Sequence, residues 1–213
     1  MKMPIRDIEF IGSMVRPDQW PKDGLPAVAF AGRSNVGKSS LINSILNRRS
    51  PLMRVSKTPG RTQQLNFVKV NRKFYVVDLP GYGYAKVPIS LKKQFGTMIQ
   101  QFLSDAAFLR AVVQILDARH APSRDDIGLL DWLQSMQIPT ILVMTKADKL
   151  SSNQLAKSRR VMQDKLGLDA DAFTIFSSET GRGRDELWER INLALDATPR
   201  HSVNEDGDED TEA

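Results

Sequence analysis

The stretch AVAFAGRSNVGKSSLINSIL, residues 27–46, decides how the rest of the chain is interpreted. It opens with a short apolar run typical of a buried strand and closes with apolar residues at helical spacing. Between the two, Gly32–Ser39 fits the pattern G-x-x-x-x-G-K-[ST] without a gap. Glycines let the main chain curl so that successive N–H groups and the helix N-terminus point at phosphate oxygens. The stretch therefore predicts a phosphate-binding loop.

Two side chains of this loop have predicted roles in holding a nucleotide. We expect Lys38 to neutralise the β- and γ-phosphates and the Ser39 hydroxyl to bind Mg²⁺. An ordinary Gly-containing turn is the alternative, but the flanking strand and helix supply the context that the motif needs. The predicted contacts are Gly32, Arg33, Ser34, Asn35, Val36, Gly37, Lys38 and Ser39.

A second motif, Asp78-Leu79-Pro80-Gly81, follows the apolar run YVV. An acidic residue at the carboxyl end of a strand can reach Mg²⁺ through a water molecule, and the Gly81 N–H can contact the γ-phosphate. Alone, D-x-x-G is a weak signal. It gains weight from its place on a strand after the phosphate loop.

The base is indicated by Thr145-Lys146-Ala147-Asp148, which ends the run ILVMT. The Asp148 carboxylate can accept two hydrogen bonds from guanine, whereas adenine presents an acceptor at N1 and would be repelled. We expect the Lys146 alkyl stem to lie along the ring. A helix-capping Asp is the alternative. Backbone N–H groups of Ser177-Ser178-Glu179 are predicted to reach the guanine carbonyl.

A loop containing Pro59 and Gly60 lies between the first helix and the next strand, and such a loop can be ordered by a ligand and released again. We predict Thr62 as the second Mg²⁺ hydroxyl in preference to Thr58. A simple turn before a strand is the alternative.

The remaining chain alternates apolar runs with longer helix-like stretches, which predicts an α/β fold with a mainly parallel sheet. Because only Asn71-Arg72 separates the second and third strands, these should form an antiparallel hairpin at one edge. We expect a Ras-like G domain with six strands, one of them an antiparallel edge strand, and helices on both faces. Predicted strands are Ala27–Ala31, Gln64–Val70, Lys73–Leu79, Ala111–Asp117, Thr140–Thr145 and Ala172–Ser177; predicted helices are Lys38–Asn47, Ser90–Leu109, Arg124–Met136, Ser151–Leu166 and Arg184–Leu195.

Residues 1–26 are expected to be an irregular lead-in, residues 27–197 the folded domain, and residues 198–213 a disordered acidic tail. The 213 residues suit one domain, and the absence of cysteine excludes disulfides and Cys-based zinc sites. We find neither a signal-peptide core nor a membrane-spanning run, so we expect a cytoplasmic chain with no membrane partner.

The charge is unevenly placed. The net charge is +5, but residues 201–213 hold six acids and no Lys or Arg, so residues 1–200 carry +11. A body this basic favours nucleic acid as a partner. Charge that only maintains solubility is the alternative. Our preferred RNA face surrounds the hairpin and the Thr62 loop: Arg48, Arg49, Arg54, Lys57, Lys69, Arg72 and Lys73.

Taken in order, these motifs resemble the translation-factor-related GTPases, and the combination GRSNVGKSSLIN, KTPGRTQ, DLPGYGYAKV and DARH resembles the EngB family (also called YihA or YsxC). The likeness covers residues 10–195. It implies GTP and GDP binding with Mg²⁺, a role in late assembly of the large ribosomal subunit with its rRNA and proteins as partners, and a link to cell division and septation. By this resemblance Mg²⁺ ligands are Ser39 and Thr62, and nucleotide contacts extend to Gly60, Arg61, Thr62, Gln63, Gln64, Asp78, Leu79, Pro80, Gly81, Thr145, Lys146, Ala147, Asp148, Phe176, Ser177 and Ser178.

Tyr82 stands directly after D-x-x-G, where a Gln would position the attacking water. We therefore expect slow intrinsic GTP hydrolysis, with Lys38, Asn35 and Thr62 as catalytic residues. Asn35 occupies the position where related GTPases hold K⁺, so we hypothesise that K⁺ assists at the transition state. Arg61 and His120 are rival suppliers of positive charge.

Two other functions stay open at this point. One is a GTP-dependent, protein-binding switch acting on the division machinery without RNA contact. The other is a P-loop kinase or ATPase, which tight ATP binding would indicate. We expect a monomer.

Overall fold

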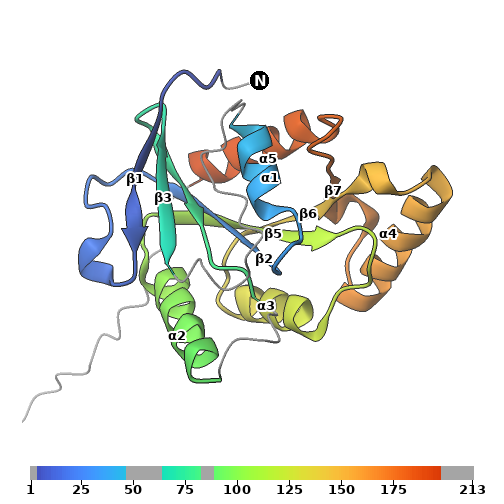
Figure 1. The fold of residues 1–213 in the computed structure, drawn as a ribbon, viewed down its shortest axis with the longest axis horizontal. Helices are drawn as coiled ribbons and strands as arrows, with labels where there is room; N and C mark the ends of the chain where they lie inside the picture. Colours follow the sequence, from blue (N-terminus) through green and yellow to red (C-terminus); the bar gives the residue numbers. More distant parts are fainter. Residues whose placement is uncertain (1–3, 47–63, 83–88, 198–213) are drawn as a thin grey trace, which may run out of the picture.

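The computed structural model describes residues 4–46, 64–82 and 89–197. It confirms an α/β fold with one mostly parallel sheet and helices on both of its faces (Figure 1). The strand order is β1-β3-β4-β2-β5-β6-β7. The strands are β1 (Ile8–Met14), β2 (Ala27–Gly32), β3 (Leu65–Val70), β4 (Phe74–Asp78), β5 (Leu109–Asp117), β6 (Thr140–Thr145) and β7 (Phe173–Ile175).

Within the described residues the helices lie between or after these strands, and five of them are α-helices and three are short 3-10 helices. The α-helices are α1 (Lys38–Ile45), α2 (Ile89–Asp105), α3 (Arg124–Ser135), α4 (Ser152–Leu166) and α5 (Arg184–Asp196). The 3-10 helices are η1 (Pro17–Gln19), η2 (Ala147–Lys149) and η3 (Ala170–Ala172). No helix in these ranges is long and apolar enough to cross a membrane.

The sheet separates two main apolar layers. On one face, α1 and α5 cover the sheet through Leu41, Ile45, Leu187 and Trp188. On the other face, α2 and α3 cover it through Phe102, Leu103 and Leu133. A third cluster packs α4 against β6. Strand β2 is buried along its whole length because helices lie over both of its faces, and this explains its unbroken apolar sequence.

The described part of the chain forms one strand more than the sequence predicts. Residues 8–14 lie in the segment expected to be irregular, yet they form β1, which pairs antiparallel with β3. The register shifts between Phe10 and Gly12, so Ile8 packs on one side of the sheet while Ile11 and Met14 pack on the other. This bulge interrupts the period-2 alternation by which a strand is recognised in sequence.

The predicted hairpin is present, but it is not at the edge. β3 and β4 pair antiparallel with Val70 opposite Phe74, so residues 71–73 connect them; Asn71 and Arg72 both have positive φ (50° and 56°), as in a type I′ turn. The Asn71 side chain accepts hydrogen bonds from the N–H groups of Arg6 (2.8 Å) and Asp7 (3.1 Å). The turn thus tethers the chain that leads into β1 and helps to cover the outer side of β3.

All six predicted strands and all five predicted helices are present; β6 has the predicted bounds, and the others are shifted at one or both ends. The largest shift is at Leu109, which we placed in a helix and which begins β5 instead. Leu109 is fully buried and pairs with Ala27 of the neighbouring strand β2. A pairing between two strands cannot be predicted from the spacing of apolar residues along a helix. The acidic tail lies outside the described residues.

Candidate nucleotide-binding site

The phosphate loop joins the carboxyl end of β2 to the first turn of α1, as predicted. Its shape depends on two glycines. A Cβ at Gly32 would lie 2.8 Å from Val36 Cγ1 and 3.1 Å from the Ile115 carbonyl oxygen, so the loop passes too close to β5 for any side chain. Gly37 has φ 103°, which L-residues rarely adopt. These constraints place the loop at the head of α1, where the helix dipole favours an anion.

The D-x-x-G sequence lies beside this loop because β4 is the neighbour of β2. The Lys38 ammonium forms an ion pair with Asp78 Oδ1, and the two side chains are only 10% and 6% exposed. The buried Lys38 ammonium is thus paired with a carboxylate oxygen. A phosphate oxygen also carries negative charge, so it could replace that carboxylate as the partner of Lys38.

The base-specificity motif is attached to the phosphate loop through hydrogen bonds. The Thr145 hydroxyl donates to the Val36 carbonyl oxygen at 2.7 Å, and Lys146 Nζ donates to the Asn35 carbonyl oxygen at 2.6 Å. These residues are more than a hundred positions apart in the chain. Both contacts fix the end of β6 relative to the loop.

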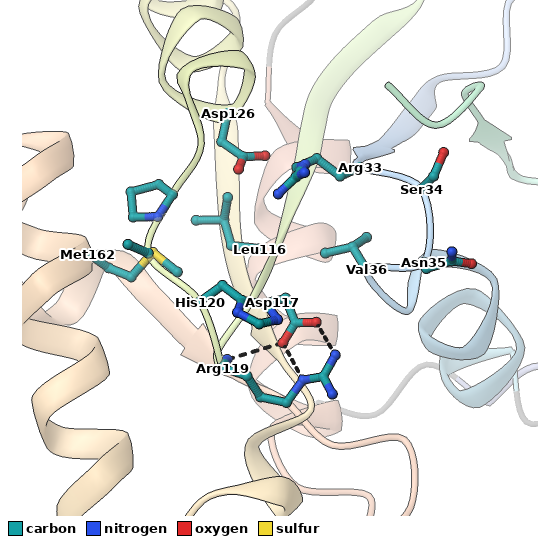
Figure 2. Close-up of a pocket in the computed structure, with 12 residues that line it drawn as sticks. Arg33, Ser34, Asn35, Val36, Leu116, Asp117, Arg119, His120, Asp126 and Met162 are labelled. Carbon is teal, nitrogen blue, oxygen red and sulfur yellow. Dashed lines mark hydrogen bonds and ion pairs between the residues drawn. The ribbon is translucent and has the colours of Figure 1, made fainter. Parts of the chain in front are cut away.

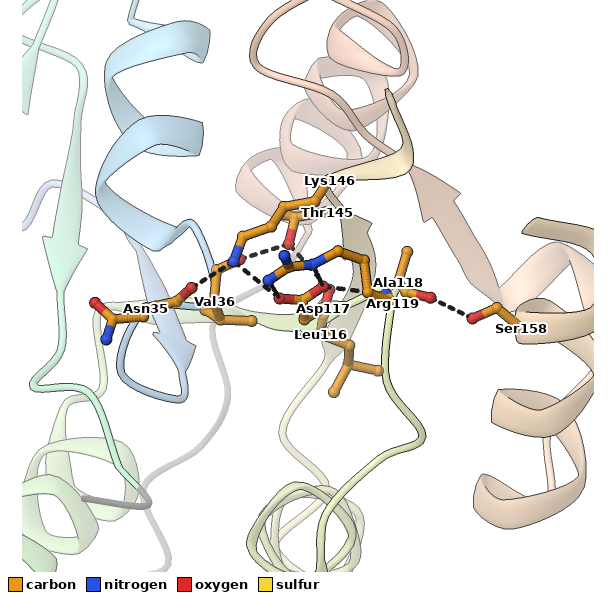
Figure 3. A network of polar contacts seen from close by, with 9 residues as sticks. All are labelled: Asn35, Val36, Leu116, Asp117, Ala118, Arg119, Thr145, Lys146 and Ser158. Atoms are coloured by element: carbon orange, nitrogen blue, oxygen red, sulfur yellow. Dashed lines mark hydrogen bonds and ion pairs between the residues drawn. The ribbon is translucent and has the colours of Figure 1, made fainter. Parts of the chain in front are cut away.

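Asp117 completes this network and was not among the predicted site residues (Figure 3). Its carboxylate accepts from Lys146 Nζ (2.8 Å) and from Arg119 Nε (2.9 Å) and Nη2 (2.7 Å). Burial opposes ionisation of Asp117, but these hydrogen bonds outweigh it and hold its pKa well below the ordinary value. The signal in the sequence was an acidic residue at the end of β5, the strand adjacent to β6.

Asp148 is held in place by a residue from a different predicted motif. The Ser177 hydroxyl donates to Asp148 Oδ1 at 2.7 Å, and this bond keeps the pKa of Asp148 low. Ser177 Oγ in turn accepts from the N–H groups of Glu179 and Thr180, both at 3.2 Å. Ala147 N–H donates to the Phe176 carbonyl oxygen at 3.2 Å. The two segments predicted to bind the base are thus joined to each other, and the carboxylate between them is ionised.

Tyr82, which follows D-x-x-G, pairs with the phosphate loop through its main chain. Its N–H donates to the Gly32 carbonyl oxygen (3.3 Å), and its carbonyl oxygen accepts from Ser34 N–H (3.1 Å). Its hydroxyl donates to Asp126 Oδ1 at 2.9 Å. Burial, and then the charge of Asp126, raises the pKa of Tyr82. The phenol therefore stays protonated and acts as a donor.

A cavity of about 210 Å³ borders the phosphate loop on the side of α3 and α4. Figure 2 shows Arg33, His120, Asp126 and Met162 around the same hollow. His120, a rival supplier of positive charge, is thus placed next to the loop. It follows Asp117 by three residues, and its N–H donates to the Asp117 carbonyl oxygen at 3.1 Å.

Four predicted contacts, Gly60, Arg61, Thr62 and Gln63, lie outside the described residues, and so do the predicted metal ligand and catalytic role of Thr62. Gln64 is exposed just before β3. The described ranges contain no group of three or more His, Asp or Glu residues able to hold a metal. A Mg²⁺ ion would therefore depend on the Ser39 hydroxyl, the nucleotide's own oxygens and Asp78, a hard oxygen set that suits this ion.

Comparison with known proteins agrees with this geometry. Residues 27–146 match the family described as "50S ribosome-binding GTPase". A protein of Geotalea daltonii named "Probable GTP-binding protein EngB" is 49% identical over 203 residues, covering 95% of this chain and 98% of the relative. A protein of the same name from Bacillus subtilis is 46% identical over 194 residues, covering 91% of this chain and 99% of the relative.

Among solved structures, the crystal structure of a probable GTP-binding protein engB superposes with a TM-score of 0.66 at 24% identity, covering 79% of this chain and 98% of the other. That likeness supports the fold. The sequence identity to the named relatives, over nearly their whole length, goes further: the chain belongs to the EngB family of P-loop GTP-binding proteins.

Proposed function

We propose that this protein is a slow, Mg²⁺-dependent GTPase that acts as a nucleotide-gated factor in assembly of the large ribosomal subunit in the cytoplasm. Family membership supports the GTPase class. The finer parts of the proposal are the low intrinsic rate, the ribosomal partner, a monomeric state and the link to division and septation.

One observation carries the nucleotide assignment: an ionised Asp148 is joined to Ser177, while the adjacent Lys146 is bonded to the Asn35 carbonyl of the phosphate loop. A carboxylate fixed in this way can accept both guanine donors, whereas adenine would leave it facing an acceptor. Lys38 and the N-terminus of α1 would bind the phosphates. Mg²⁺, held by Ser39 and the phosphates with Asp78 nearby, would neutralise charge on the β- and γ-oxygens.

The low rate is supported by Tyr82. The Tyr82 phenol already donates its proton to Asp126 Oδ1, and it lacks the amide group with which a Gln would orient a water molecule. A positive group from elsewhere would have to assist. We hypothesise that K⁺ does so near Asn35, whose exposed side chain points away from the Lys146 network (Figure 3). Equal hydrolysis rates in K⁺ and Na⁺, with ribosomal subunits present, would exclude this role.

The ribosomal partner is supported by the basic body of the chain and by the family's description. Two described members of our predicted RNA face are already paired: Lys69 with Asp23 (2.8 Å) and Arg72 with Asp7 (3.1 Å). The Arg72–Asp7 pair is well exposed, and exposed ion pairs are weak, so Arg72 can exchange its partner for phosphate. Lys69 is only 22% exposed and lies over the Tyr75 ring, so it is the less available of the two cations.

The test is co-sedimentation with purified 50S subunits in GDP or in a non-hydrolysable GTP analogue. We expect stronger binding with the analogue, and binding that weakens steeply as salt rises because phosphate contacts release counterions. Asp148→Asn is the matched control. Its amide should favour xanthine over guanine, so this variant should co-sediment with the xanthosine analogue instead.

Three results would refute the proposal. Tight ATP binding by the unmutated protein would contradict the guanine assignment. Absence of 50S binding in either nucleotide would contradict the ribosomal role. Binding to isolated division proteins that is insensitive to salt would favour the protein-binding switch instead.

A further inference from the structure

Both the main chain and the side chain of Tyr82 form hydrogen bonds. The partner of the side chain is Asp126, a residue to which no role has been assigned. The main chain of Tyr82 lies parallel beside Arg33, bonded to Gly32 and Ser34. Its ring packs with the apolar cluster beneath α2 and α3. Its hydroxyl donates to Asp126 Oδ1, 2.9 Å away.

Asp126 is a rigid acceptor. It is 4% exposed and sits in the first turn of α3, where the helix dipole favours negative charge. Its Oδ2 accepts from Ser123 N–H (2.8 Å) and from the Ser123 hydroxyl (2.7 Å), and its main-chain carbonyl accepts from Gln114 Nε2 (2.7 Å). Oδ1 is thereby aimed at Tyr82 by a capped helix that packs on the sheet. The phenol, with its raised pKa, remains a donor.

The anchored arrangement occupies groups that a triphosphate would use. The Lys38 ammonium is paired with Asp78, and the Ser34 N–H is bonded to the Tyr82 carbonyl oxygen. Gly81 lies close to the loop, since a Cβ there would be 3.2 Å from Ser34 N. A ligand can shift such an arrangement only through contacts that differ between two states. GTP differs from GDP by its third phosphate, the group that would contact Gly81.

We propose that Asp126 is a positioning residue: by holding the Tyr82 hydroxyl it stabilises the arrangement in which Asp78 is paired with Lys38 and the Tyr82 carbonyl with Ser34 N–H, and so lowers affinity for the third phosphate relative to GDP. The bond acts as a built-in bias toward the GDP state. This inference rests on the proposed GTP function.

The test compares binding of GDP and of a non-hydrolysable GTP analogue, both carrying a methylanthraniloyl fluorophore, in the presence of Mg²⁺. In Tyr82→Phe the ring keeps its packing and only the hydroxyl is lost. We expect analogue affinity to rise roughly ten- to 150-fold relative to GDP affinity, the equivalent of one hydrogen bond to a charged acceptor. Combining Asp126→Ala with Tyr82→Phe should not raise this ratio further, because the bond is already absent.

Tyr75→Phe is the matched control. The Tyr75 hydroxyl also donates to a carboxylate, Asp23 Oδ2 at 2.7 Å, on the same sheet but away from the phosphate loop. Tyr75→Phe should leave the ratio of analogue affinity to GDP affinity within about twofold of the value for the unmutated protein. If Tyr82→Phe still binds guanine nucleotides but its affinity for the analogue relative to GDP is unchanged or lower, the role of Asp126 is refuted and the proposed GTP function is not. Failure of the unmutated protein to bind either nucleotide would overturn the proposed function as well.

Discussion

At the scale of single residues, the site depends on charges that are shared between motifs. Lys146 illustrates this, because its ammonium bonds the Asn35 carbonyl and the Asp117 carboxylate at once. Because the ammonium group of Lys146 is hydrogen-bonded, its alkyl chain is restricted to few rotamers. The alkyl chain is therefore preorganised for its predicted position along a base. The anion that holds this tip is the Asp117 carboxylate, which comes from β5 and begins the DARH sequence, separate from the motif that contains Lys146.

We expect Asp117→Asn to weaken GDP binding about five- to tenfold. The change replaces a charge-assisted hydrogen bond with a neutral one, and its effect is moderated because Lys146 is partly exposed. Fluorescence titration with labelled GDP measures this. Arg119→Gln, which removes the more exposed partner of the same carboxylate, should change the affinity less than about twofold. Equal effects of the two substitutions would show that Asp117 does not act through Lys146.

At the scale of elements, α5 links the loop that is predicted to bind the base to the phosphate-loop helix α1. α5 begins directly after Gly183, and its residue Arg184 donates through Nε to the Ser44 carbonyl oxygen of α1 at 2.9 Å. Trp188 Nε1 donates to the Ile45 carbonyl oxygen at 3.2 Å. These bonds satisfy carbonyls that the end of a helix leaves without intrahelical partners. The two ends of the nucleotide site are thereby coupled through one helix.

Gly183, directly before α5, allows a quantitative prediction about the free energy of unfolding. Gly183 has φ 77°, and a Cβ there would lie 2.2 Å from the Ile175 carbonyl oxygen. Gly183→Ala should therefore reduce the free energy of unfolding by more than about 3 kcal/mol, since steric overlap adds to left-handed strain. Gly181→Ala, at φ 76° with open space around it, should cost only about 1 kcal/mol. Urea denaturation measures both, and equal losses would contradict the steric argument.

At the scale of the whole molecule, its response to acid is set by carboxylates whose pKa values are low in the folded state. Burial opposes ionisation of Asp117 and Asp23, but hydrogen bonds to the first from Arg119 and Lys146, and to the second from Lys69 and Tyr75, outweigh it. A group with a depressed folded pKa stabilises the protein above its unfolded pKa, about 4 for a carboxyl. That stabilisation is lost as pH falls through the folded pKa.

For Asp117 this predicts a definite pH window. The difference in unfolding free energy between the unmutated protein and Asp117→Asn should be constant from pH 7 to pH 5 and should shrink below about pH 4. Urea titrations at several pH values measure it. A difference that stays constant from pH 7 down to pH 3 would show that the folded pKa of Asp117 is not lowered.

Much of this protein could be predicted from its sequence, because local signals specify local structure. The phosphate loop needs glycines at Gly32 and Gly37, and the buried strand and helix that flank it have clear periodicity, so both the motif and the α/β class were predictable. Carboxyl ends of parallel strands meet at one edge of a sheet. The order of motifs therefore also predicted that Asp78, Lys146 and Asp148 would converge.

Tertiary structure alone decided which side chains from different motifs meet. Asp117 holds Lys146, Ser177 orients Asp148 and Asp126 anchors Tyr82, and each pair is separated by at least 29 positions in the chain. β1 likewise joined the sheet because β3 presented an unpaired edge, and the bulge at Phe10–Gly12 concealed its alternation. Periodicity and motif spacing describe a chain along its length, whereas these contacts depend on how helices and strands pack in space.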